Sequence, residues 1–283
     1  MTHEQKKQVR DALVRYMSTF STQTEAAATL HGISLSTISQ VKNHNWDLLS
    51  DRLWHHIAKQ VGFYCGEWCA ADTSAYLLLR ILMGDAQHYG MAYGIAIGNG
   101  IGKTFSAAQY AREHENVIYA AGNSAYNRKS FLSALLAAAG ENMESSSPEM
   151  LDSLAGIVAA KDMPLLIVDD AHLLKDRVLH VLVLLANKLS GKVGLILMGN
   201  DTLRTRIVEG VRLRKPGFTE IYKTIGKRFI TLGCLAPGDV AAVCQANGIH
   251  DRETINFITD ASNSNLHTAA CLISEQTQQR IAA

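Results

Sequence analysis

The 283-residue chain lacks any apolar run of roughly 18 uninterrupted residues, the length that a membrane-spanning helix requires. It also lacks the basic and then apolar start of a secretory signal peptide, because its first residues are polar. Its net charge is small, since 27 Lys and Arg stand against 26 Asp and Glu. That balance does not by itself indicate a nucleic-acid-binding protein. We therefore expect a cytoplasmic protein with no membrane partner, whose function must be inferred from local patterns.

Cysteine is scarce, and the odd number of five does not suggest a disulfide framework. Most of the cysteines lie in apolar surroundings, so reduced thiols are expected. Cys65 and Cys69, with His55 and His56 upstream, leave a zinc site as an alternative. Their spacing fits one face of a helix better than a zinc knuckle, and the sequence therefore favours no metal there.

A glycine-rich segment carries the clearest chemical signal. It follows the apolar residues 95–97 and reads Gly98-Asn99-Gly100-Ile101-Gly102-Lys103-Thr104. Glycines let backbone N–H groups wrap a polyphosphate, the lysine reaches the β and γ phosphates, and the threonine hydroxyl binds Mg²⁺. The helix expected after this segment adds the positive end of its dipole. These seven residues therefore predict an ATP site.

A second motif lies at the end of a buried strand. Residues 165–168 are too apolar to be anything but a covered strand, and Asp169 and Asp170 follow them. Ligands of open α/β sheets bind at the carboxyl ends of the strands. We expect Asp169 to hold Mg²⁺ together with Thr104, directly or through water, and Asp170 to activate the attacking water.

Two departures from common P-loop patterns predict slow hydrolysis. In the usual spacing, G-x-x-x-x-G-K-[ST], glycine would stand at position 97, where this chain has Ile97. Otherwise Gly98 begins a loop that is one residue short. In addition, Asp170 stands where many such ATPases have the longer glutamate. The alternative for the segment is a glycine-rich turn that binds nothing.

The first 62 residues carry a different signal. Residues 24–30 predict a short helix, Gly32 a turn, and Ser34 the cap of a second helix over 35–41. The pattern is similar to a phage-repressor helix-turn-helix, whose second helix enters the major groove of DNA. Its side chains facing bases and phosphates would be Ser36, Thr37, Gln40 and Lys42. A helical hairpin used for protein contact is the alternative.

Periodicity in the remaining sequence predicts a parallel sheet with helices on both faces. Helix is expected to continue from 48 to about 82 as a connection. Strands are expected at 94–97, 116–120, 164–168 and 193–198. Helices are expected at 103–113, 129–140, 149–160 and 174–189, and then only helices from Pro237, at 237–246, 251–260 and 264–280. The predicted domains are 1–62, 63–85, 86–234 and 235–283.

Four segments together resemble the phage Mu B transposition protein family. They are residues 98–104, 107–110, 167–174 and 194–200. This family belongs to the AAA+ ATPases, near the IstB and TnsC transposition regulators, and the similarity covers nearly the whole chain. It implies an α/β AAA+ P-loop ATPase with a parallel sheet flanked by helices, an N-terminal helix-turn-helix domain and a small C-terminal helical lid.

The resemblance also implies a function. The family members bind double-stranded DNA without sequence preference in the presence of ATP and Mg²⁺, form filaments on it and deliver it to a transposase in the bacterial cytoplasm. Asn200 matches the residue that orients the attacking water. Thr224 stands where the family has its trans-acting arginine, so Arg228 is the nearest substitute, and His267 replaces the arginine of the lid. Missing arginines would further slow hydrolysis.

Two basic segments are candidates for contact with DNA. In the loop 123–130, the resemblance implies that Tyr126, Arg128 and Lys129 face DNA, with an ordinary exposed loop as the alternative. Between residues 204 and 228 lie eight Lys or Arg, which would face phosphates, solvent or another subunit. Two other functions remain open: a helicase loader similar to DnaC, and a sequence-specific regulator whose ATP site is vestigial.

Overall fold

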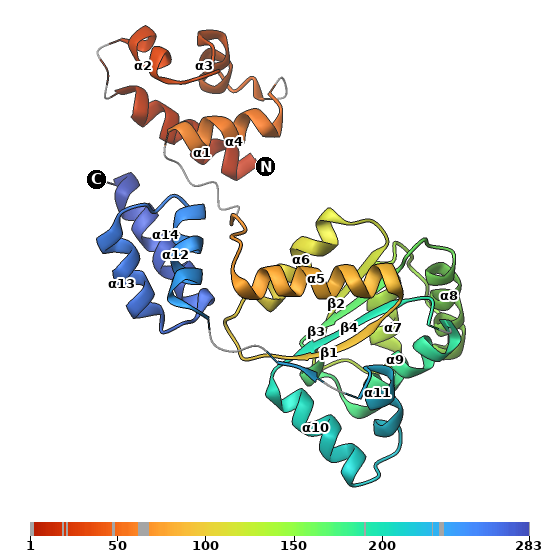
Figure 1. Ribbon diagram of the computed structural model, residues 1–283. Coiled ribbons are helices and arrows are strands. Elements are labelled where there is room, and N and C mark those ends of the chain that lie inside the picture. The colour runs from red at the N-terminus through yellow and green to blue at the C-terminus, as the bar shows by residue number, and fades with distance from the viewer. Residues whose placement is uncertain are drawn as a thin grey trace. The chain divides into compact units, whose positions relative to one another are not determined.

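The computed structural model describes residues 3–18, 20, 22–46, 49–61, 68–189, 191–227, 229–231 and 235–282. The chain divides into two compact units, one comprising 1–70, 246–249 and 271–283, and the other comprising 71–245 and 250–270. Figure 1 shows the helices and strands of both units. Among the described residues, no helix combines the length and the apolar character needed to cross a bilayer.

A parallel five-stranded sheet forms the centre of the larger unit (Figure 1), with the order β2-β3-β4-β1-β5. The strands are β1 (Ala92–Ala96), β2 (Val117–Ala121), β3 (Leu165–Asp169), β4 (Gly194–Gly199) and β5 (Phe229–Ile230). Every residue of β3 and β4 is buried, as expected for apolar runs in a parallel sheet that is covered on both faces. The predicted parallel sheet is confirmed, although the sequence did not reveal β5.

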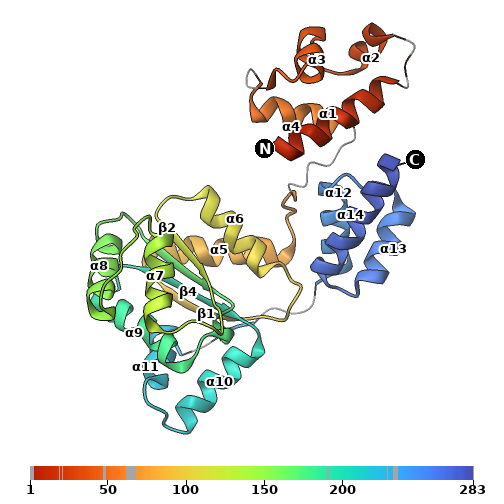
Figure 2. The ribbon, with the colours of Figure 1, turned by 180° about the vertical axis from the view of Figure 1, so that it is seen from behind.

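Helices cover both faces of this sheet (Figure 2). On one face, α5 (Ser74–Tyr89) and α6 (Lys103–Glu113) pack against Ile95, Ile167 and Ile196. A second core includes Leu166, Val168 and Leu197, whose side chains point to the opposite face because successive strand residues alternate. The helices of this second core are α7 (Arg128–Ala138), α8 (Ser147–Ala159), α9 (Asp176–Leu189), α10 (Asp201–Arg212) and α11 (Phe218–Thr224).

The helix predicted from 48 to about 82 is wrong. Instead, α4 (Asp51–Gln60) ends before residues 68–73, which are not helical, and α5 begins after Thr73, whose hydroxyl accepts the N–H of Tyr76. The N-cap at Thr73 starts a new helix. α5 is also not a connection, because its buried side chains belong to the core beneath the sheet. The sequence did not predict α10 or α11 either.

The N-terminal helices α1 (His3–Ser18), α2 (Gln23–Thr29), α3 (Leu35–Lys42) and α4 enclose a small core. Trp54 is fully buried and meets Trp46 edge to face, with ring centroids 5.4 Å apart. Gly32 makes the turn between α2 and α3 with a φ of 70°, and the side chain of Gln60 bonds both the N–H and the carbonyl of His31 there. The two short helices lie where the sequence predicts them. Their binding of DNA stays a prediction.

The C-terminal helices are α12 (Pro237–Ala246), α13 (Arg252–Ser262) and α14 (Leu266–Ala282). Asp239 joins α12 to the start of α5, because its Oδ1 accepts the N–H of Ser74 at 2.8 Å and the Ser74 hydroxyl at 3.1 Å. Its Oδ2 accepts the N–H of Ala236 at 3.0 Å. These bonds satisfy a carboxylate that is only 7% exposed.

Candidate nucleotide site

The glycine-rich segment forms a loop between β1 and α6. Gly100 and Gly102 adopt φ angles of 82° and 92°, in the left-handed region that glycine enters without steric cost. The N-cap position at Gly102 makes no side-chain hydrogen bond to the first N–H groups of α6. Uncapped N–H groups at a helix N-terminus suit an anion. The loop is therefore formed, although its glycines depart from the usual P-loop spacing.

Lys103 lies beneath this loop, only 7% exposed. Its Nζ donates to the carbonyls of Ile97 at 2.8 Å and Gly98 at 2.7 Å. Burial lowers the pKa of Lys103 from its ordinary value, while the carboxylates of Asp169, Asp170 and Asp201 oppose that shift. A partly desolvated ammonium held by two neutral carbonyls gains strongly from a polyphosphate placed beside it.

Asp169 stands at the carboxyl end of β3 and is fully buried. Its Oδ1 accepts the N–H of Asp170 at 2.8 Å, and its Oδ2 accepts the Tyr119 hydroxyl at 3.3 Å. Burial raises the pKa of Asp169 above its ordinary value, against the hydrogen bond from Thr104, which lowers it. Thr104 therefore lies near this carboxyl. A hydroxyl and a carboxylate side by side are the oxygen donors that Mg²⁺ takes beside a nucleotide phosphate.

Asp170 and Asn200 lie beside this pair. Asp170 has a φ of 45°, an unusual value for a residue with a side chain, and strain of this kind gathers at functional sites. Its Oδ1 lies 3.8 Å from Nδ1 of His172. Asn200 follows β4 directly after Gly199, whose carbonyl accepts the N–H of Ile97 at 3.1 Å. The amide oxygen of Asn200 caps α10 by accepting the N–H of Thr202 at 3.1 Å. The strand ends thus bring the predicted carboxylates and amide to the glycine-rich loop.

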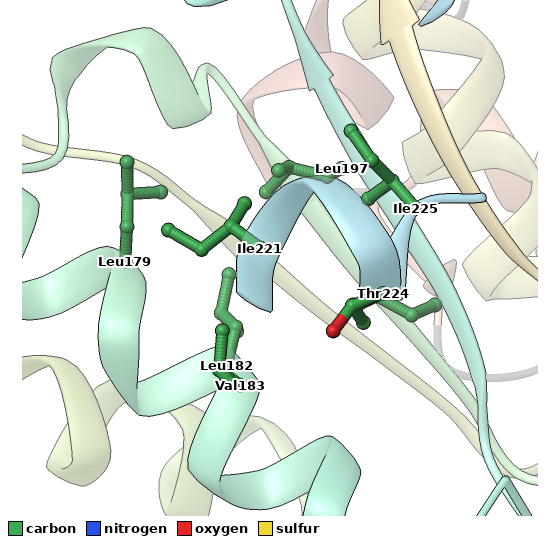
Figure 3. A pocket seen from close by; sticks show the side chains of 8 residues that line it. Leu179, Leu182, Val183, Leu197, Ile221, Thr224 and Ile225 are labelled. Atoms are coloured by element: carbon green, nitrogen blue, oxygen red, sulfur yellow. The ribbon is translucent and has the colours of Figure 1, made fainter. Parts of the chain in front are cut away.

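Arg228, the predicted substitute for the arginine finger, lies outside the described residues. Thr224 is partly exposed and lines a small apolar cavity with Leu179, Leu182 and Ile221 (Figure 3). Its hydroxyl donates to the carbonyl of Glu220 at 2.9 Å. The cavity measures about 10 Å³, roughly the space for one water. It is a packing gap without room for a ligand, and Thr224 contributes no charge. His267 is exposed in the first turn of α14.

Three residues of the site escaped sequence reasoning. Tyr119 contacts Asp169, as described above. Gly122 lets the end of β2 approach β3 closely, because a Cβ there would lie 2.4 Å from the carbonyl oxygen of Asp170. Asn265 covers Gly100, and the next residue, Leu266, donates its N–H to the Gly100 carbonyl at 2.7 Å. Because side chains alternate between the two faces of a sheet, the sequence of β2 could have placed Tyr119 on the same face as Asp169. No local signal in the sequence points to Asn265.

Gly100→Ala is expected to destabilise the larger unit. The new Cβ would lie 2.4 Å from the amide of Asn265 and would sit on a residue with positive φ. We expect a loss of about 1–3 kcal/mol in the free energy of unfolding, measured by denaturant titration of the nucleotide-free protein. Gly98→Ala is the matched control, since nothing lies within 4 Å of a Cβ at that position. Equal stabilities of the two variants would contradict the described loop geometry.

The residues expected to contact DNA occupy two places. Arg128 and Lys129 are exposed in the first turn of α7, and Tyr126 is half-buried, its ring centroid 5.9 Å from that of Phe131. A cleft of about 770 Å³ adjoins them, lined by Asn127, Arg128, Lys175, Asp176, Arg177, Val178 and His180.

The remaining candidates lie in α3, in the smaller of the two units. The hydroxyls of Ser36 and Thr37 lie 2.7 and 2.9 Å from the Ser34 hydroxyl at the start of α3. Gln40 and Lys42 follow along that helix, partly exposed. Cys65 lies outside the described residues. Within those that are described, no group of three or more His, Cys, Asp or Glu is arranged to hold a metal ion.

Comparison with known families agrees with the geometry of the nucleotide site. Residues 93–207 match the family model of the AAA domain, a stretch that includes the glycine-rich loop, both aspartates and Asn200. No curated protein matches the chain. The matched model, the parallel sheet and the loop together support an AAA-type ATPase domain, a kind of domain that generally binds a nucleotide with Mg²⁺.

Proposed function

We propose that this protein is an ATP-dependent DNA-binding regulator of transposition, which assembles on target DNA and presents it to a transposase. The observation that carries the DNA contact is the first turn of α7. Arg128 and Lys129 occupy it, with no acidic residue there. Cations are unfavourable at the positive end of a helix dipole unless an anion is bound nearby. Among the described residues, neither side chain forms an ion pair.

The neighbouring helix supports the same contact. Lys175 and Arg177, just before and within the first turn of α9, line the cleft together with Arg128, and all three are exposed. Of the described residues that line the cleft, Asp176 alone is acidic, and it is paired with Arg206. Such a row of cations suits successive phosphates of a nucleic-acid backbone without reading its bases. Tyr126 and Lys129 would extend this surface.

The cleft proposed for DNA and the nucleotide site are formed by elements that follow neighbouring strands. α7 follows β2 and α9 follows β3, and β3 also carries Asp169, which belongs to the nucleotide site. ATP held between neighbouring copies would favour assembly on DNA, as any ligand favours the state that binds it. Hydrolysis would then release the DNA. The shorter Asp170 and the apolar setting of Thr224 favour slow turnover, which suits a timer.

The helix-turn-helix is a second DNA contact in this proposal. Ser36, Thr37, Gln40 and Lys42 of α3 would meet a DNA groove and its phosphates. Ser36 and Thr37 have short side chains, and their hydroxyls already bond to Ser34, so little sequence preference is expected from them.

Arg128→Gln is expected to weaken DNA binding equally on unrelated sequences. Removing one phosphate contact should lower the slope of log affinity against log salt concentration by about 1. Fluorescence anisotropy of two unrelated duplexes over a salt series measures this slope. Arg112→Gln is the matched control, because Arg112 is exposed in the last turn of α6 and does not line the cleft. The same slope for Arg128→Gln and wild type would remove Arg128 from the DNA interface.

Electron microscopy of the protein on arbitrary duplex DNA tests the proposed assembly. Filaments that form with ATP, and are lost with ADP or without nucleotide, are expected. Discrete particles at one sequence, unchanged by nucleotide, would instead indicate a sequence-specific regulator with a vestigial ATP site. Co-purification with a replicative helicase, without filaments, would indicate a helicase loader.

A further inference from the structure

Tyr119 lies on β2, the strand next to Asp169, and on the same face of the sheet. In the register of the two strands Tyr119 pairs with Ile167, and Ala121 pairs with Asp169. Because side chains two residues apart share a face, Tyr119, Ile167 and Asp169 all point toward α6, the helix of the glycine-rich loop. The Tyr119 hydroxyl donates to Oδ2 of Asp169 at 3.3 Å.

We propose that Tyr119 is a positioning residue for the metal-binding carboxylate of Asp169, an inference that rests on the proposed ATP and Mg²⁺ site. The N–H of Asp170 and the Tyr119 hydroxyl donate to this carboxylate, and hydrogen bonding with Thr104 lowers its pKa. Thr104 is itself an expected metal ligand, so its hydroxyl oxygen would turn its lone pair to the metal. Tyr119 is then the side-chain donor that keeps the carboxylate oriented.

The burial of Asp169 and Tyr119 makes the orientation of the Asp169 carboxylate depend on the Tyr119 hydroxyl. Asp169 is fully buried and Tyr119 is half-buried, so water does not readily replace a missing donor. The Asp170 N–H fixes Oδ1, and the Tyr119 hydroxyl fixes Oδ2, so the two bonds together set the rotation of the carboxylate plane. Oxygens that support a metal ligand in this way commonly change metal affinity by tenfold or more when they are removed.

Tyr119→Phe tests the role, because the ring and its packing remain while the hydroxyl is lost. Binding of a fluorescent ATP analogue is measured with Mg²⁺ and with EDTA. Wild type is expected to bind the analogue more tightly with Mg²⁺ than in EDTA. Tyr119→Phe is expected to bind it roughly tenfold more weakly than wild type with Mg²⁺, and with the same affinity as wild type in EDTA. Tyr93→Phe is the matched control, since Tyr93 also lies in the sheet but its hydroxyl contacts the sulfur of Met91.

A double-mutant cycle with Asp169→Asn separates this role from general packing. If Tyr119 acts through the carboxylate, Tyr119→Phe should change nothing further once Asp169→Asn is present. An unchanged Mg²⁺ dependence in Tyr119→Phe would overturn the inference, and so would equal weakening with and without Mg²⁺. Absence of nucleotide binding in the wild-type protein would instead contradict the proposed function. Circular dichroism of the nucleotide-free variants confirms that each is folded.

Discussion

Lys103→Ala is expected to abolish nucleotide-dependent behaviour. In the proposed site the buried ammonium would meet the β and γ phosphates, and it also holds the loop through the carbonyls of Ile97 and Gly98. Losing both contributions should lower ATP hydrolysis by about a hundredfold or more. Steady-state phosphate release, with and without DNA, measures this loss.

A surface lysine provides the comparison for this variant. Lys192→Gln removes an exposed cation just before β4, at the amino ends of the strands, whereas the nucleotide site lies at their carboxyl ends. Its hydrolysis rate should equal that of wild type. Hydrolysis by Lys103→Ala at the wild-type rate would mean that the glycine-rich loop is not the catalytic site.

Asp169→Asn is expected to stop Mg²⁺-dependent hydrolysis and, at the same time, to stabilise the nucleotide-free protein. Burial raises the pKa of Asp169, so the folded state holds its proton more tightly than the unfolded chain does. Above that raised pKa, the buried charge opposes folding, and the neutral amide removes this cost. We expect the melting temperature of the larger unit to rise by about 2–4 °C near neutral pH, a gain of about 1 kcal/mol.

The pH dependence checks the sign of this effect. As the pH falls through the raised pKa toward the ordinary value of 3.8, wild-type Asp169 takes up its proton and regains stability. The advantage of Asp169→Asn over wild type should therefore shrink on acidification. Calorimetric melting at a series of pH values measures the difference. A variant that melts below wild type at neutral pH would show that the carboxylate stabilises the fold and would contradict this account.

Much of the larger unit follows from its sequence, because its strands are buried on both faces and read as short apolar runs. β3 and β4 are the clearest cases, and their ends carry Asp169 and Asn200 into one site. β5 could not be seen in this way, since it has only two residues and is defined by its pairing with β1. The charges of α10 hid its helical periodicity, although Leu203 and Ile207 are fully buried.

The missed part of the site depends on long-range contacts. Tyr119 meets Asp169 only because of the register between β2 and β3. Asn265 reaches Gly100 from the position just before α14, far along the chain, and local patterns carry no information on such a contact. The predicted helix from 48 to about 82 failed for a related reason, because periodicity on both sides outweighed the N-cap at Thr73. Cap residues set the ends of helices that periodicity alone would join.

In the proposed function, a nucleotide bound in the loop of residues 98–104 controls binding to DNA. The most direct measurement is the affinity of the wild-type protein for a random-sequence duplex with ATP and Mg²⁺, with ADP and Mg²⁺, and without nucleotide. We expect the wild-type protein to bind the duplex tightly only with ATP and Mg²⁺. Binding should be equally weak with ADP and Mg²⁺ and without nucleotide, and Lys103→Ala should bind weakly in every condition. Equal affinity in all of these conditions would contradict the account.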